Sequence, residues 1–374
     1  MKSYSIVPSH RNVPARVRAG WSDASQIWAR PIDPTIRTIM MMLTLGLYLL
    51  FRFALLDLLP AKFMVDAGTI ADILAGQDIG TEGDSFNMTA SMFALFPEGL
   101  QTGLVVSLGC AMIVMTFRVL RSWGGVITAL TILFPLLILG LVAPSKETLV
   151  IMISFVILAA SRLGRGFLPV MVSCLVLYLA YGSLVRDYYL LILGLFLALV
   201  VYSRLPMALR IVVAILATSA ILLVPNDIFM QLQGTRDESN TYAQYIAFSD
   251  NRTAFFNPLV PDSLGHFLVN YVYAAILLNF PFVSFLSARD MVLFINVLIY
   301  ASLVRTSLRH GAMREKTLAT LFLSHVLVLW LFEPDLGSYF RHFSSVFAYL
   351  IPALALREQR FLIKREVPCP ATAM

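Results

Sequence analysis

The sequence FEPDLGSYFRH, from Phe332 to His342, lies between two apolar runs that are each long enough to cross a lipid bilayer. It combines two acids, an arginine, a histidine, a proline and a glycine. We interpret it as the polar connection between two membrane helices, at about 317–333 and 338–356. This mixture of residue types is unusual at a membrane surface, and it is the first indication of a functional site.

The helix that follows this connection begins with a polar stripe. Helical spacing places five polar residues on one face, namely Ser338, Arg341, His342, Ser345 and Tyr349. The N-terminus of a helix is positively polarised, so an arginine there is unfavourable unless an anion lies beside it. The stripe therefore indicates an anionic ligand.

The same stretch supplies candidates for catalysis. Glu333, Asp335 and His342 are candidate general acids or bases. Arg341 and Tyr339 are candidate substrate-binding residues. The alternative is an ordinary loop, in which Asp335 caps the helix and Arg341 reaches toward the lipid headgroups.

The composition is that of a membrane protein. Hydrophobic residues make up 59% of the chain, charged residues make up 13%, and the mean hydropathy is +0.79. Soluble proteins carry about 25% charged residues. The three cysteines show no CxxC spacing, so we expect neither a disulfide nor a metal bound by cysteine. We also expect no nucleic-acid partner, because no basic segment is interleaved with aromatic residues.

Apolar runs of roughly 20 residues predict an all-α, polytopic integral membrane protein with about ten transmembrane helices. The predicted helices span residues 38–59, 99–117, 124–143, 147–161, 167–184, 187–203, 208–225, 285–304, 317–333 and 338–356. These ten helices belong to one predicted transmembrane domain, 38–356. Residues 1–37 and 357–374 are predicted to be cytoplasmic tails.

The basic residues orient these helices. Ten crossings place 20 of the 28 Lys and Arg residues on the side of both termini, which the positive-inside rule identifies as the cytoplasm. An additional crossing at 264–280 would move the basic residues at 305–316 to the outer side. We therefore interpret 264–280 as a re-entrant or interfacial helix. It belongs to the second of two large outer loops, 60–98 and 226–284.

A second polar motif, PSKE, spans Pro144 to Glu147 after the third predicted helix. Ser145 suits the N-cap of the next helix, and Glu147 suits its positive end. Lys146 opposes both the helix dipole and the positive-inside trend. The motif therefore adds Lys146 and Glu147 to the candidate binding residues.

Further candidates for binding a phosphate-bearing ligand lie on the outer side, namely Arg186, Arg236, Arg252 and His266. Each has a simpler alternative. Arg186 can pair locally with Asp187, surface arginines are often only solvated, and a lone histidine at a helix start is often packed or capping. No Walker A, GxGxxG, HExxH or GxSxG motif occurs in the sequence, so we expect no cofactor and no metal.

The motifs APSKETL and FEPDLGSYFRH, with a large outer loop between them, resemble the bacterial Wzy-type and EpsG-like polysaccharide polymerases. The resemblance implies an enzyme of the bacterial inner membrane that joins oligosaccharide units carried on undecaprenyl pyrophosphate at the periplasmic face. It implies roles for Lys146, Glu147, Asp335, Arg341 and His342, with the arginines binding pyrophosphate. It also implies membrane lipid, a chain-length regulator and a flippase as partners.

Other functions use the same lipid. An O-antigen ligase or another membrane glycosyltransferase would place its catalytic acid in the first outer loop, where Asp66 and Asp84 lie. A flippase would place cations along a central cavity, on more than one helix. A non-enzymatic assembly subunit is the third alternative. Because the acids of the first loop are widely spaced in the sequence, we expect them to be dispensable and FEPDLGSYFRH to hold the reacting groups.

Overall fold

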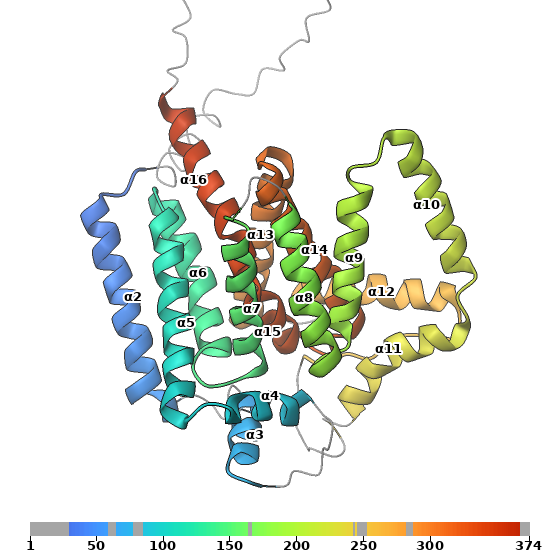
Figure 1. Ribbon diagram of the computed structural model, residues 1–374, viewed down its shortest axis with the longest axis horizontal. Helices are drawn as coiled ribbons and strands as arrows, with labels where there is room; N and C mark the ends of the chain where they lie inside the picture. Colours follow the sequence, from blue (N-terminus) through green and yellow to red (C-terminus); the bar gives the residue numbers. More distant parts are fainter. Residues whose placement is uncertain are drawn as a thin grey trace, which may run out of the picture.

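The computed structural model describes residues 30–58, 65–77, 85–163, 167–241, 244, 253–281 and 287–366. Within these ranges the regular elements are helices (Figure 1). They are α2 (Pro34–Ala54), η1 (Leu56–Leu58), α3 (Val65–Leu74), α4 (Ser85–Ala94), α5 (Glu98–Val119), α6 (Trp123–Gly140), α7 (Lys146–Ala160), α8 (Leu168–Leu184), α9 (Tyr188–Tyr202), α10 (Met207–Leu222), α11 (Asn226–Thr241), α12 (Leu264–Asn279), α13 (Ala288–His310), α14 (Met313–Phe332), α15 (Leu336–Ser345), η5 (Phe347–Leu350) and α16 (Ile351–Glu366).

The all-α class and the positions of the helices along the chain are predicted well from the sequence. The helices α5 to α10 each begin within one residue of the predicted range. Figure 1 shows α2 and α5 to α9 side by side with roughly parallel axes, while the direction of the chain alternates from α5 to α9. The helix α14 packs against α9, α13 and α15, so it lies at the centre of the bundle.

Among the described residues, five helices are long and apolar enough to cross a membrane, namely α2, α5, α6, α13 and α14. The number rises to six if α10 and α11, which meet at 85°, form one bent span. The exposed surface suits lipid as well, since the apolar helix α10 buries none of its side chains and α2 buries only Tyr48. The protein is therefore a helical membrane protein.

The ten predicted crossings are not confirmed. The apolar helices α8 and α9 have 17 and 15 residues, and at 1.5 Å per residue such helices span only about 22–26 Å. The hydrocarbon core of a bilayer is about 30 Å thick. The last predicted crossing is divided into α15, η5 and α16. The polar stripe is divided with it, because Tyr349 lies in η5 and its hydroxyl contacts that of Tyr178 at 2.8 Å.

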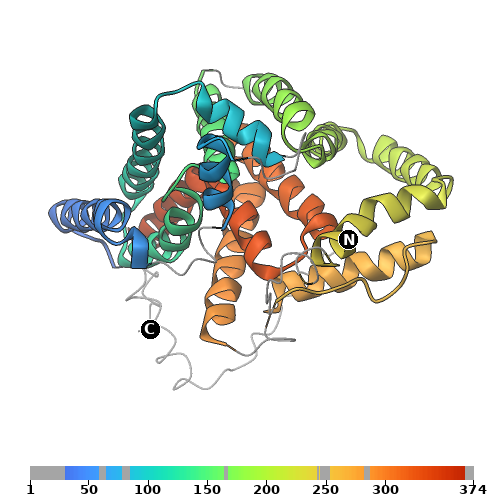
Figure 2. The same cartoon turned by 90° about the horizontal axis from the view of Figure 1, so that it is seen from below.

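The predicted non-spanning helix at 264–280 corresponds to α12. In both views α12 and α11 lie across the direction of the neighbouring helices (Figures 1 and 2). The second predicted outer loop thus contains two helices, and it contacts the connection between α14 and α15. There Asn240 donates to the carbonyls of Phe255 and Pro334, at 2.8 and 3.2 Å. The position of α12 relative to a membrane surface stays a prediction.

At one end of the bundle, a glutamate from α16 holds the start of α6. Glu358 Oε2 accepts hydrogen bonds from the backbone N–H of Arg121 at 2.9 Å, and from the N–H and hydroxyl of Ser122 at 2.8 Å each. The side chain of Glu358 is fully buried. This carboxylate lies directly over Gly125, because a Cβ atom at that position would be 2.4 Å from Oε2.

Replacing Gly125 with alanine should therefore destabilise the protein. Overpacking of this kind typically costs about 1–3 kcal/mol, and here it would also displace the carboxylate that holds Ser122, the N-cap of α6. The free energy of unfolding in detergent measures the effect. Gly103→Ala is the matched control, because a Cβ at Gly103 of α5 meets nothing within 4 Å. Equal stability of the two variants would contradict the prediction.

Candidate functional site

Six charged or titratable side chains meet at the lower end of the bundle in Figure 1, where α3, α4 and α15 lie. We call them the charged cluster. Its members are Asp66, Glu147, Arg186, Glu333, Arg341 and His342. They come from α3, α7, the connection between α8 and α9, the connection between α14 and α15, and α15. Five of the six were candidates from the sequence, and the structure brings them together.

Asp335 begins α15. Its Oδ1 accepts hydrogen bonds from the backbone N–H groups of Gly337 and Ser338, at 2.7 and 3.0 Å. This is an N-cap, the simpler role considered for Asp335 on sequence grounds. The cap fixes the start of α15, so that Arg341 and His342 project toward α7 from its second turn. A catalytic role for Asp335 stays a prediction, and its observed contacts are those of a structural residue.

The start of α7 positions Glu147. Ser145 and Thr148 form a capping box, in which each side chain bonds the backbone N–H of the other residue at 3.2 Å. Lys146 turns toward α4, where its Nζ lies 3.2 Å from the ring centroid of Phe86 and 3.3 Å from the hydroxyl of Ser85. Lys146 thus borders the charged cluster and contacts the helix that covers it.

Glu147 is the buried centre of the charged cluster. Its Oε1 lies 3.1 Å from His342 Nε2, 3.5 Å from Arg341 Nε and 3.7 Å from Arg186 Nη2. Its side chain is 1% exposed. Among the described residues, neither carboxylate oxygen has a partner with good hydrogen-bond geometry. The carboxylate is therefore stabilised by the surrounding positive charges, and Oε2 remains available to another donor.

His342 is held through both ring nitrogens. Nδ1 contacts the carboxylate of Glu333, while Nε2 lies 3.0 Å from Arg186 Nη1 and 3.1 Å from Glu147 Oε1. Glu333 can accept the Nδ1–H, which leaves Nε2 as the atom that gains or loses a proton. Without a proton Nε2 can accept from Arg186, and with a proton it can donate to Glu147. Both protonation states thus have a partner in place.

Glu333, the acid that orients His342, lies in surroundings that favour its ionised form. Burial would raise the pKa of Glu333, but His342, Ser338 and Arg186 together outweigh burial, and the pKa of Glu333 is lowered. An ionised carboxylate that holds one nitrogen of a histidine is the arrangement of a general base with an orienting partner. In His342 the other nitrogen, Nε2, faces Glu147 and Arg186. This is the main chemical capability of the site.

Asp66 was missed as a site residue. Arg341 Nη1 lies 2.9 Å from Asp66 Oδ2, so an acid of the first outer loop joins the charged cluster. The side chains of Arg341 and Asp66 are 23% and 16% exposed, against 1% for Glu147. These two residues therefore form the side of the cluster that is open to an incoming molecule. Asp84, the other acid considered there, lies outside the described residues.

Arg186 contacts the charged cluster. Its Nη1 donates to the hydroxyl of Tyr188 at 2.9 Å, and its Nη2 faces Glu147. Only 9% of its side chain is exposed. The sequence alternative was a local pair with Asp187; the observed ion pair instead joins Arg186 to α7. A buried guanidinium that faces a carboxylate and a histidine is suited to binding an anion.

Two other candidates, Arg236 and His266, form no ion pair with the charged cluster among the described residues. Arg236 is buried, and it donates to the backbone carbonyls of Trp330, Leu331 and Glu333 at 2.5, 2.8 and 3.0 Å. It therefore holds the C-terminal end of α14. His266 is partly exposed and pairs with Asp262 at 2.7 Å.

Tyr339 and Arg252 are the other two candidates from the sequence. The hydroxyl of Tyr339 donates to Asn279 Oδ1 at 3.1 Å and accepts from the indole of Trp330 at 3.3 Å. Arg252 lies outside the described residues.

Within the described part of the chain, no group of three or more His, Cys, Asp or Glu side chains is arranged to hold a metal ion. The comparisons with protein-family models, with curated proteins and with solved structures give no match.

Proposed function

We propose that this chain is a glycosyltransferase of the bacterial inner membrane, of the Wzy-type polymerase kind, which joins oligosaccharide units carried on undecaprenyl pyrophosphate at the outer face. One observation carries the proposal. His342 is oriented by Glu333 through Nδ1, and its Nε2 lies beside Arg186. Both His342 and Arg341 contact the carboxylate of Glu147. A base and two cations thus share one site.

The chemistry of this reaction matches those groups. The acceptor hydroxyl attacks the anomeric carbon of the donor sugar, and the bond from that carbon to the pyrophosphate oxygen breaks. The hydroxyl proton passes to His342 Nε2. The electron pair leaves with undecaprenyl pyrophosphate, whose additional negative charge Arg186 and Arg341 stabilise. The reaction is balanced without a metal or a nucleotide.

The location of the cluster also fits a lipid-linked donor. The ends of α5, α9 and α13 and the start of α2 lie at the upper end of Figure 1, opposite α3, α4 and α15. Arg118 and Arg309 lie in the last turns of α5 and α13, at that upper end. By the positive-inside rule the charged cluster is then on the outer side, where polymerisation takes place.

This topology predicts the accessibility of two exposed sites. In a chain whose native cysteines are replaced, Leu95→Cys should react with an impermeant maleimide from the periplasmic side, and Leu163→Cys only from the cytoplasmic side. Both positions are strongly exposed, at 79% and 85%, so accessibility rather than burial decides the result. Labelling of both positions from the same side would contradict the proposed orientation.

The assay for function uses purified protein with an undecaprenyl-pyrophosphate-linked oligosaccharide, and it measures chain length and yield. Arg341→Ala should reduce the rate by about 10²- to 10³-fold, which is typical for loss of a group that stabilises developing charge. Arg341→Lys should recover only part of the activity, because lysine keeps the charge and loses the bidentate geometry. His266→Ala is the control, since His266 lies outside the charged cluster.

The alternatives give different products in this assay. A ligase would transfer the glycan to a different acceptor and would form no polymer. A flippase would move the lipid-linked unit across a vesicle without forming a bond. Among the described residues, the cations that contact Glu147 gather at one end of the bundle, whereas a flippase requires them along a path across the membrane. Unchanged polymer formation in both Arg341 variants would contradict the proposal.

A further inference from the structure

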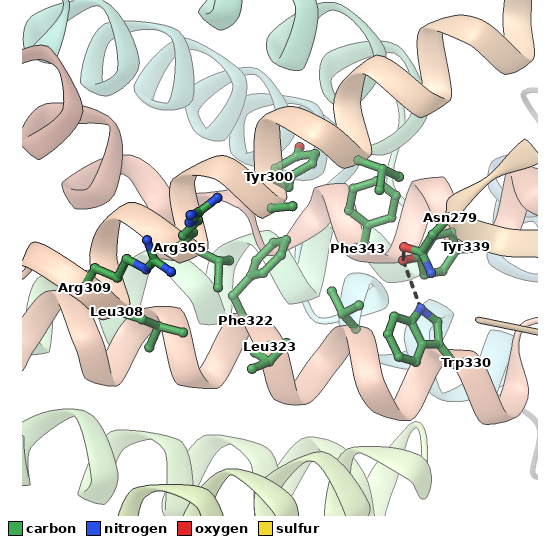
Figure 3. Close-up of a pocket in the computed structure, with 14 residues that line it drawn as sticks. Asn279, Tyr300, Arg305, Leu308, Arg309, Phe322, Leu323, Trp330, Tyr339 and Phe343 are labelled. Carbon is green, nitrogen blue, oxygen red and sulfur yellow. Dashed lines mark hydrogen bonds between the residues drawn. The ribbon is translucent and has the colours of Figure 1, made fainter. Parts of the chain in front are cut away.

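A second site lies between α13 and α14, away from the charged cluster. It is a cavity of about 420 Å³ (Figure 3), a volume within the usual range for a ligand site. Its middle is apolar and includes Phe322 and Leu323. In Figure 3 Arg305 and Arg309 lie at one end, and Asn279, Tyr339 and Trp330 lie at the other. The cavity is therefore elongated, with an apolar centre and a cationic end.

The cationic end carries charge without a protein partner. Arg305 and Arg309 are four residues apart on α13 and both line the cavity, so they lie on one face of the helix, one turn apart. Among the described residues, neither makes a hydrogen bond or an ion pair, and both are exposed. Two adjacent guanidinium groups with no carboxylate between them form a site for a phosphate group.

The apolar part of the cavity opens toward the membrane. Leu308 lines it and is 38% exposed. The helix α13 is long and apolar enough to span a bilayer, and it exposes further large apolar side chains, including Ile295 and Leu298. An apolar groove on the lipid-facing surface of such a helix is filled more favourably by a hydrocarbon chain than by water.

We infer that this groove binds an anionic phospholipid, with an acyl chain between α13 and α14 and the phosphate on Arg305 and Arg309. Basic pockets between membrane helices on the cytoplasmic side are suited to such headgroups. The lipid-linked donor does not fit equally well. The arginines lie near the end of α13 and the charged cluster follows the end of α14, whose 20 residues span about 30 Å. A pyrophosphate on Arg305 would therefore lie far from His342.

The experiment is native mass spectrometry of the purified full chain in detergent, titrated with phosphatidylglycerol or with phosphatidylcholine of the same acyl chains. The wild-type protein should bind phosphatidylglycerol more tightly. The double variant Arg305→Gln, Arg309→Gln should weaken phosphatidylglycerol binding by on the order of 30-fold and lose the preference. Arg118→Gln is the matched control, because Arg118 is an exposed arginine in the last turn of α5, outside the cavity.

A second variant tests the acyl-chain part. Ala301→Trp narrows the groove from its exposed side and leaves both arginines in place; it should weaken both lipids. The inference is overturned if the double variant keeps the preference for phosphatidylglycerol, or if Arg118→Gln loses it to the same extent. It is also overturned if the bound species has the mass of a polyprenyl lipid. Because binding is measured without polymerisation, these results are independent of the proposed function.

Discussion

Replacing His342 with alanine should reduce the rate of glycan polymerisation by about 10²- to 10⁴-fold, the usual effect of losing a general base. The side chain is enclosed by Glu333, Glu147 and Arg186, with only 10% of its surface exposed. Of the two described groups that contact Nε2, neither is suited to replace it, because Arg186 carries no basic lone pair and the Glu147 carboxylate is surrounded by positive charge. The turnover rate with saturating lipid-linked donor is the measurement.

The role of His342 has a signature besides the rate. A general base acts in the transition state, so His342→Ala should lower the turnover rate and leave the KM for the lipid-linked donor nearly unchanged. Asp335→Asn is the control from the same stretch. Asparagine caps a helix about as well as aspartate, so this variant should stay near wild-type activity. Loss of activity in Asp335→Asn with retention in His342→Ala would move the base to Asp335.

The sequence predicts the positions of the helices in this protein better than the number of its membrane crossings. Apolar runs bounded by Gly, Pro and capping residues define where α5 to α10 begin. The number of crossings depends on differences of only a few residues in helix length and on bends such as the 85° angle between α10 and α11. The last predicted crossing is likewise divided at Val346, although residues 346–351 are continuously apolar or aromatic in the sequence.

The candidate site shows the same limit. Charge type and unusual position identify Glu147, Arg186 and Arg341, because cations and acids near apolar runs require partners. Which partners meet is decided by packing between segments far apart in the chain. Asp66 was therefore dismissed on spacing within its own loop, although its partner Arg341 comes from α15. Arg236 resembled an anion-binding residue, yet its ligands are backbone carbonyls, which no sequence pattern reveals.

Glu147→Gln should have the largest effect on stability. Removing one partner of a buried ion pair typically costs 3–5 kcal/mol, because the remaining charge stays buried without compensation. Arg341 would retain Asp66, and His342 would retain Glu333. Among the partners observed here, Arg186 would retain the hydroxyl of Tyr188 and the contact with His342 Nε2, but no carboxylate. The free energy of unfolding in detergent should therefore fall by about 3–5 kcal/mol, with the loss concentrated at Arg186.

An anionic ligand should reverse part of this loss, which connects the stability of the cluster to the proposed substrate. In Glu147→Gln, a bound pyrophosphate group supplies the negative charge that Arg186 and Arg341 lack, so undecaprenyl pyrophosphate should stabilise the variant more than it stabilises the wild-type protein. Asp66→Asn is the matched control. Its pair with Arg341 is partly exposed, and pairs of that kind contribute about 0–1 kcal/mol. Two results would contradict this role of Glu147, in which its carboxylate neutralises Arg186 and Arg341 when no anion is bound. One is an equal loss of stability in Glu147→Gln and Asp66→Asn. The other is equal stabilisation of Glu147→Gln and the wild-type protein by the lipid.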